Sequence, residues 1–178
     1  PIFCQATGGG LNGCTSCPCG NESVFSVGGC LNSFANSAVL MVEGQASVSF
    51  DTLRLDVSFA IPNSFGVLLS GDGRLPANPS NPCFGLATGV PSLVLDGLRC
   101  VGVNVQRHGT RATDDAGSIG RTTPAWGFPN GPVGGLIAQG GFTAGTTRHF
   151  QAFYRDNPLL GCGTGQNTTQ GVSVVFLP

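Results

Sequence analysis

The distribution of the eight cysteines constrains the fold of this chain more than any other feature of its sequence. Of the 178 residues, the first 30 hold Cys4, Cys14, Cys17, Cys19 and Cys30, and the remainder holds Cys83, Cys100 and Cys162. Both groups are odd in number. If all eight thiols are oxidised, at least one disulfide must join the N-terminal segment to the rest of the chain or to another subunit. Such a bond closes a long loop, which the chain-entropy treatment values at about 4 kcal/mol.

The cysteine cluster near the N-terminus allows three kinds of chemistry: a metal site, a redox motif or structural disulfides. Cys14, Cys17 and Cys19 offer thiolates, but zinc sites favour paired C-x2-C knuckles and a second pair is missing. A thioredoxin-like motif at residues 14–17 would need a βαβ setting, which the pattern does not predict. An even cysteine count in a glycine-rich chain without lysine favours export and disulfides. We therefore expect disulfides, no bound metal and no cofactor.

Alternating apolar residues predict an all-β domain. From Leu53 to Phe59 every second residue is apolar, as expected for a strand with one buried face. An earlier register, carried by Val48 and Phe50, slips at residues 51–52, which predicts a bulge or tight turn. Further strands are expected at 65–70, 99–107, 148–155 and 171–178, whereas 108–146 carries few strand signals and no stretch has helical periodicity. Short strands between Gly, Pro and Asn turns favour a β-sandwich of the jelly-roll or immunoglobulin-like class.

The length suits one domain built from two segments of different character. Residues 1–37 lack sustained periodicity and hold five cysteines, so we expect a disulfide-stapled, loop-rich N-terminal segment. Residues 38–178 carry the strand patterns and should form the β-sandwich. The N-terminal segment belongs to the same unit and is also a candidate to reach a neighbouring subunit.

Low charge narrows the range of partners. Charged residues make up 10% of the chain, against roughly 25% in ordinary soluble domains. The net charge is −1 and no basic cluster is present, which argues against nucleic-acid binding. No apolar run approaches the length of about 18 residues that a membrane-spanning helix needs. A weakly charged surface usually meets a partner, and identical subunits are the partner we expect.

Several segments together resemble an uncharacterised Cys/Gly-rich β-domain of large secreted and surface proteins of environmental bacteria. The matching pieces are CPCGN at 17–21, GCLNS at 29–33, IPNSFGVLLSGDG at 61–73, DGLRC at 96–100 and TAGTTRHFQAFYRD at 143–156. They keep their order over most of the chain, which departs from the pattern at Cys14. The resemblance implies a secreted, β-rich module and carries no catalytic residues.

Candidate catalytic and metal-binding residues are few, and we interpret each of them as structural. Asp114 and Asp115 are adjacent in a Gly/Thr-rich loop, where aspartates usually serve turns. Asp72, between Gly71 and Gly73, lacks the further carboxylates of a calcium loop. His108 and His149 have no G-x-S-x-G elbow to complete a triad. We therefore do not expect an enzyme.

Four residues are candidates for glycan chemistry. Trp126 and Phe128 could form a platform for a sugar ring, although a single Trp more often plugs the core. Asn21 and Asn167 open N-x-S/T sequons and are candidate glycosylation sites.

The composition favours a structural role: a disulfide-stapled subunit of a self-assembling extracellular filament or surface layer. Strand addition between subunits would supply the contact. The candidate inter-subunit residues are Pro1, Ile2 and Phe3 at one end of the chain and Val172, Val174 and Phe176 at the other. The alternative is a monomeric surface adhesion or carbohydrate-binding module.

Overall fold

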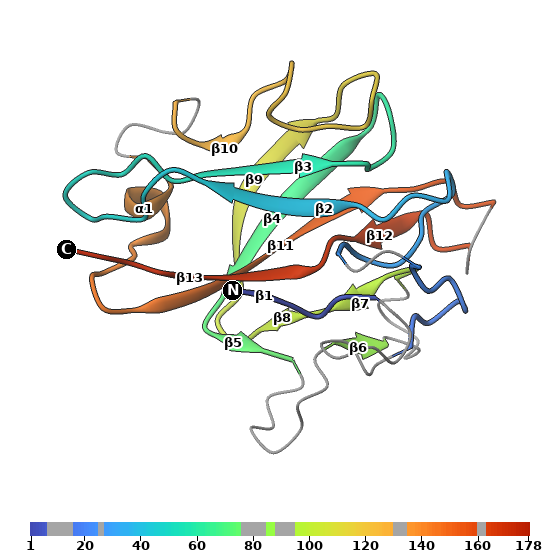
Figure 1. Cartoon of the computed structure of the whole chain (residues 1–178), viewed down its shortest axis with the longest axis horizontal. Coiled ribbons are helices and arrows are strands. Elements are labelled where there is room, and N and C mark those ends of the chain that lie inside the picture. Colours follow the sequence, from blue (N-terminus) through green and yellow to red (C-terminus); the bar gives the residue numbers. More distant parts are fainter. Residues whose placement is uncertain (7–15, 25–26, 76–84, 88–94, 130–134, 160–162) are drawn as a thin grey trace.

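The computed structural model describes residues 1–6, 16–24, 27–75, 85–87, 95–129, 135–159 and 163–178. Within them the protein is nearly all-β, and its paired strands are antiparallel (Figure 1). A short helix, α1 (Gly135–Gly140), covers one end of the strands. The prediction of an all-β class is confirmed, whereas this helix was not predicted, because six residues are too few to show a period.

The largest sheet has six strands. Its order is β1 (Ile2–Phe3), β13 (Gly171–Val175), β11 (Thr147–Arg155), β4 (Phe65–Gly71) and β9 (Gln106–Ala112), with β12 (Gln166–Thr168) also paired to β11. The central pairing aligns Phe150 with Ser70 and Phe153 with Val67. The N-terminal strand therefore closes one edge of a sheet whose other strands come from the second half of the chain and from β4.

Three smaller sheets complete the strands. One has the order β10 (Trp126–Gly127), β3 (Arg54–Ser58) and β2 (Val39–Glu43). The others pair β5 (Gly73–Arg74) with β8 (Val101–Gly102), and β6 (Leu86–Ala87) with β7 (Leu98–Arg99). In Figure 1 the β2–β3 pair lies in front of the large sheet.

The main core lies between the large sheet and the β10–β3–β2 sheet. Leu40 of β2 and Leu55 of β3 are buried in one cluster with Leu68 of β4 and Phe150 of β11. Each such fully buried side chain stabilises the fold by about 1.5–3 kcal/mol relative to exposure. The alternation predicted from Leu53 to Phe59 is thus confirmed as far as Val57, and Leu55 and Val57 form the inward face of β3.

A second, smaller core holds the N-terminal segment against the body of the protein. Phe3 and Cys4 are buried there with Leu98, Cys100 and the Cys17–Cys30 disulfide. The Cys4–Cys100 disulfide, between residues 96 apart in sequence, is the crossing bond that the odd cysteine counts required. Cys19 is also disulfide-bonded.

Three of the cysteines that we predicted to form disulfides lie outside the described residues: Cys14, Cys83 and Cys162. All described cysteines are oxidised, so the prediction of disulfides is confirmed for this part of the chain.

Buried glutamine side chains bind strands together where backbone pairing stops. Gln151 of β11 has no exposed surface; its Oε1 accepts the Cys100 N–H at 2.9 Å. Its Nε2 donates to the Leu98 and Thr169 carbonyls at 2.8 Å each. One side chain therefore fixes the segment that carries Cys100 to the centre of the large sheet.

Several predicted strands are present, but the structure begins or ends them at other residues than the sequence pattern indicated. Val48 and Phe50 are exposed in the connection between β2 and β3, so the first of the two expected registers is not a strand. Phe59 is exposed because β3 ends at Ser58 and the backbone turns there, with a φ of 64° at Phe59.

The strand expected over 99–107 is interrupted. Val103 and Asn104 adopt positive φ values of 58° and 46° and form a turn between β8 and β9. Val103 and Val105 are consequently exposed, although they alternate with polar residues as a half-buried strand would. Strand β9 then continues to Ala112, into a region where few strand signals were expected.

Candidate functional site: an apolar groove between strand edges

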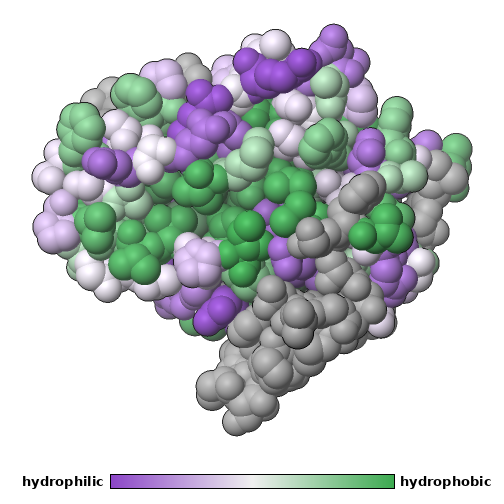
Figure 2. Space-filling model, viewed as in Figure 1, coloured by the Kyte–Doolittle hydropathy of each residue, from purple (hydrophilic) through white to green (hydrophobic). Residues whose placement is uncertain are grey.

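An apolar groove of about 450 Å³ runs between the edge of the large sheet and the β2 strand. It is lined by Pro1, Ile2, Val39, Leu40, Met41, Val42, Val172, Ser173 and Val174. Figure 2 shows hydrophobic side chains gathered in the middle of the face that carries β2 and β13. We call this feature the apolar groove.

Three side chains keep substantial exposure at the rim of the apolar groove. Ile2 of β1 is 48% exposed, and Met41 and Val42 of β2 are 38% and 40% exposed. Four consecutive apolar residues at 39–42 put hydrophobic groups on both faces of β2, while only one face meets the core. The excess of apolar residues in this strand therefore becomes surface.

The outer edge of β2 is partly closed by a side chain. Gln170, which has no exposed surface, accepts the Leu40 N–H at 3.1 Å and donates to the Leu40 carbonyl at 2.8 Å. Its amide thus substitutes for a strand residue. In an antiparallel pair outward-facing backbone groups recur every second residue, so those of Val42 also face outward. Among the described residues they have no hydrogen-bond partner, which leaves β2 open at this point.

Four of the candidate inter-subunit residues line this groove, namely Pro1, Ile2, Val172 and Val174, and the two ends of the chain pair with one another. Ile2 aligns with Val172, and the Ser173 N–H donates to the Pro1 carbonyl at 2.8 Å. Phe3, Val172, Val174 and Phe176 are buried. Within one chain β13 is paired on both edges, to β1 and to β11, so β1 and β2 are the strands whose outer edges border the groove.

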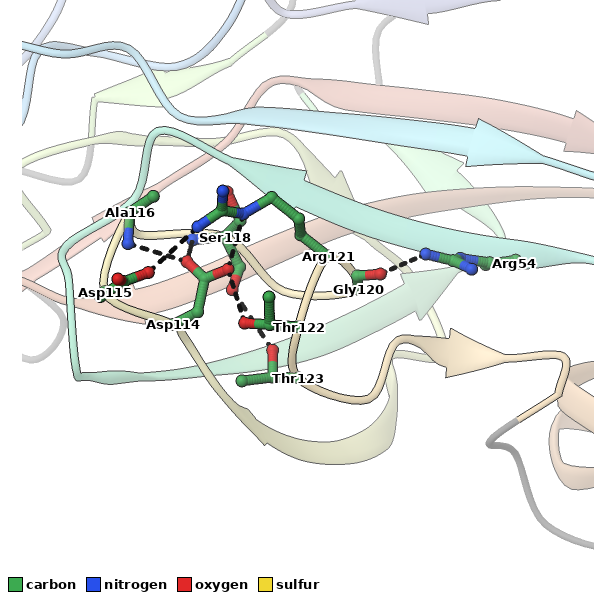
Figure 3. Close-up of polar contacts among 9 residues, drawn as sticks. All are labelled: Arg54, Asp114, Asp115, Ala116, Ser118, Gly120, Arg121, Thr122 and Thr123. Atoms are coloured by element: carbon green, nitrogen blue, oxygen red, sulfur yellow. Dashed lines mark hydrogen bonds and ion pairs between the residues drawn. The ribbon is translucent and has the colours of Figure 1, made fainter.

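The aspartate pair at 114–115 forms a structural loop rather than an acid–base site. The buried Asp114 carboxylate accepts the Ala116 and Ser118 N–H groups, the Arg121 Nε–H and the Thr122 hydroxyl, at 2.8–3.0 Å (Figure 3). Burial opposes ionisation, but these donors outweigh it and lower the pKa of Asp114 to about 2. A base this weak, with its lone pairs occupied, serves as the anchor of the loop.

The same loop is tied to the small sheet. Arg54 of β3 donates to Asp56 at 2.9 Å and to the Gly120 carbonyl, and Ile119 exchanges backbone hydrogen bonds with Val57. The Gly120 φ of 100° and the close approach of Asp56 leave no room for a side chain there. The loop therefore extends the small sheet and covers the core.

Both histidines pair with serines inside the fold. The His108 Nε2 lies 2.7 Å from the Ser70 hydroxyl, and the His149 Nδ1 lies 2.8 Å from the Ser173 hydroxyl. Burial lowers the pKa of both, and for His149 the arginines Arg74 and Arg148 contribute, bringing its pKa to about 4. Ser70 has no exposed surface, so a substrate cannot reach its hydroxyl in this fold.

In the fragment of a calcium loop at 71–73, the Asp72 carboxylate is paired with an arginine side chain of the same chain. Asp72 forms an ion pair with Arg148 and accepts a hydrogen bond from Asn104 at 2.7 Å. Among the described residues no group of three or more His, Cys, Asp or Glu side chains is arranged to hold a metal ion.

Two of the residues proposed for glycan chemistry, Trp126 and Asn167, are buried and hydrogen-bonded inside the fold. Trp126 is 1% exposed and donates its indole N–H to the Gly109 carbonyl at 2.9 Å, so it cannot stack on a sugar. Phe128 is exposed, but the buried Trp126 cannot form a sugar-binding platform with it. Asn167 is fully buried, with its Nδ2 within hydrogen-bond distance of Leu31 and Asp156, and a glycan on it does not fit this fold.

The other sequon is also occupied. The Asn21 Nδ2 donates to the Leu31 carbonyl at 2.6 Å and to the Asp96 carbonyl at 3.0 Å. Attachment of a glycan to this nitrogen would break at least one of these bonds. Both sequon asparagines therefore act as links between the N-terminal segment and the body.

Comparison of the chain with protein-family models, with curated proteins and with solved structures found no match. Over the described residues no helix is long and apolar enough to cross a membrane. Sequence reasoning named the chain ends that line the apolar groove but missed β2 and the groove itself, because the lining comes from β1, β2 and β13, which are distant in sequence. The four-residue apolar run at 39–42 was the one local signal for it.

Proposed function

We propose that the protein is a structural subunit of an extracellular filament or surface layer, and that its subunits associate at the apolar groove. The observation that carries the proposal is the groove itself: exposed apolar side chains beside a strand with outward-facing backbone groups at Val42. Contiguous apolar surface next to an open strand edge is typical of interaction sites. The facing sheets are interpreted as a β-sandwich, a rigid body suited to this role.

The N-terminal strand is the proposed donor. Within one chain β1 is held to β13 by the Ile2–Val172 and Phe3–Gly171 pairs, and it can make the same pairs with β13 of a neighbouring subunit. Exchange of an identical element keeps every pairing and is a low-cost route to assembly. The groove would then lie at the junction, since Ile2 forms part of its wall. A head-to-tail contact of this kind grows into a filament where its rotation does not close.

The disulfide chemistry supports a durable extracellular role. In an exchanged assembly the Cys4–Cys100 bond becomes a covalent link between subunits, because Cys4 follows β1 directly. The chain has no lysine, so cystine is the covalent reinforcement available to it. Disulfides persist in oxidising compartments, which agrees with secretion.

The test compares two substitutions that differ in their distance from the groove. We expect Val42→Asp to raise the concentration needed for assembly about tenfold or more, since it places a charge in an apolar contact, which costs at least about 1.4 kcal/mol. Val24→Asp, at an 89% exposed position outside the groove lining, is the matched control and should leave assembly unchanged. Sedimentation velocity and electron microscopy of the oxidised protein measure the outcome.

Strand exchange has its own readout. On a non-reducing gel the assembled protein should show a ladder of covalent oligomers that Cys4→Ala abolishes. Point substitutions are preferable to removal of residues 1–6, because that segment also buries Phe3 in the second core. If the native protein is still monomeric at a concentration of about 100 μM, the proposal is refuted.

A further inference from the structure

A second cavity lies on the large sheet, on the face turned away from the main core. It has a volume of about 340 Å³ and is lined by side chains of β4, β9 and β11, among them Phe65, Val67, Arg107, Thr110, Phe153 and Arg155. We call it the arginine cavity. Its volume falls within the range of roughly 300–1,000 Å³ found for small-molecule sites.

The strand register explains how these side chains come together. Phe153, Val67 and Thr110 are aligned across β11, β4 and β9, so they stand side by side on one face. Their neighbours Leu68 and Tyr154 belong to the core, and successive side chains of a strand point to opposite faces. The row is therefore an open floor, with Phe153 and Val67 half-buried in it.

A bulge shapes one wall of the arginine cavity. The pairing of β4 with β9 shifts between Val67 and Leu69, and Gly109 takes a φ of 86° at this point. The Gly109 carbonyl is held by the Trp126 indole. Because of the bulge, Arg107 lies opposite Leu69, the residue of β4 that follows Val67 on the same face. The buried Trp126 holds the bulged backbone at Gly109 in place.

The charges of the arginine cavity are unbalanced. Six of the eight arginines have a described partner: Arg54, Arg121 and Arg148 pair with carboxylates, Arg99 and Arg111 donate to carbonyls, and Arg74 lies over the Phe3 ring. The guanidinium groups of Arg107 and Arg155 have none among the described residues, and both line this cavity. No Asp or Glu is among its lining residues. The nearby Asp156 carboxylate instead accepts the Ser33 and Asn157 N–H groups.

We propose that the arginine cavity binds a carboxylated saccharide chain of the uronic-acid class. Guanidinium forks match carboxylates in a bidentate manner, and two of them flank an apolar floor. The Phe65 ring, 59% exposed, offers its face to a sugar ring, and Thr110 and Gln166 supply neutral hydrogen-bonding groups. An acidic peptide would offer carboxylates to the two arginines but no sugar ring to the Phe65 face. The assignment does not depend on filament assembly.

The probe is an oligogalacturonate, measured by isothermal titration calorimetry on the native protein. We expect binding that weakens about tenfold in Arg107→Gln and in Arg155→Gln, which corresponds to loss of one charge-assisted hydrogen bond in each. Phe65→Ala should weaken it to a similar extent by removing the stacking surface. Arg99→Gln, outside the cavity, is the matched control and should bind as the native protein does.

Three further ligands decide the chemical class. The methyl-esterified oligogalacturonate keeps the sugar rings and lacks the charge, so it should bind at least about tenfold more weakly. Polyglutamate and tripolyphosphate keep the charge and lack the sugar, and they should also bind more weakly. Equal binding of polyglutamate or tripolyphosphate would overturn the saccharide assignment, and unchanged binding in both arginine variants would overturn the site.

Discussion

The Cys4–Cys100 disulfide should contribute more to stability than any local cross-link, and the structure allows the contribution to be calculated. Its cysteines are 96 residues apart, so chain entropy assigns it about 4.7 kcal/mol at 25 °C. The Cys17–Cys30 bond spans 13 residues and receives about 3.0 kcal/mol. We expect the double substitution Cys4→Ala/Cys100→Ala to lower the free energy of unfolding by about 1.7 kcal/mol more than Cys17→Ala/Cys30→Ala does.

Equilibrium unfolding in urea measures both losses. Trp126, the only tryptophan, is buried in the main core and reports global unfolding by its fluorescence. At an m value of about 2 kcal/mol per M, the Cys4→Ala/Cys100→Ala variant should unfold at about 2 M lower urea than the native protein. Alanine is preferred to serine because these positions are buried and a hydroxyl there would lose its hydrogen bonds to water.

One result would contradict this reasoning. If Cys17→Ala/Cys30→Ala loses as much free energy as the long-range pair, loop length does not govern the effect. The comparison applies to the monomeric chain: if the unfolding midpoint of the native protein rises with protein concentration, Cys4–Cys100 joins two subunits, as the proposed strand exchange requires, and the loop of 96 residues no longer sets its contribution.

Two further predictions concern polar anchors. Replacing Gln170 by Leu should lower the free energy of unfolding by about 2–4 kcal/mol, because the Leu40 N–H and carbonyl lose their hydrogen-bond partner. Urea unfolding measures this loss, and a loss below about 0.5 kcal/mol would show that water replaces the Gln170 amide. The Asp114 pKa is lowered from 3.8 to about 2, so its contribution is complete above pH 3.8 and is lost as the pH falls through 2. The Asp114→Asn variant should be less stable than the native protein at pH 7 and should lose less stability between pH 4 and 2. The control is Asp115→Asn, which should behave as the native protein does because the Asp115 side chain is 85% exposed.

Local patterns predicted what depends on neighbouring residues. The alternation at 53–57 identified the inward face of β3, and the apolar segments at 65–70 and 148–155 identified β4 and β11. Where chain reversal depended on backbone conformation, the pattern misled: Val103 and Asn104 form a turn, although Val101, Val103 and Val105 alternate perfectly. Alternation does not encode the positive φ values that interrupt a strand.

The candidate sites show the same division. Residues 39–42 reveal an excess of apolar side chains, but only the tertiary structure places Ile2 beside them to form a groove. Asn167 matches a sequon in sequence and is an internal hydrogen-bond donor in the fold. Arg107 and Arg155 look like any other arginines until the partners of the remaining six are known.

The sequence by itself determined the β class and showed that, if all eight thiols are oxidised, one disulfide must leave the N-terminal segment for the rest of the chain or for another subunit. These follow from periodicity and from parity, which require no knowledge of distant contacts. The tertiary structure decided that Cys4 reaches Cys100, that Gln170 closes part of an open strand edge, and that one cavity holds Arg107 and Arg155, whose guanidinium groups have no partner in the described part of the chain. Each depends on strand order and register, and those are set by packing between residues far apart in the chain.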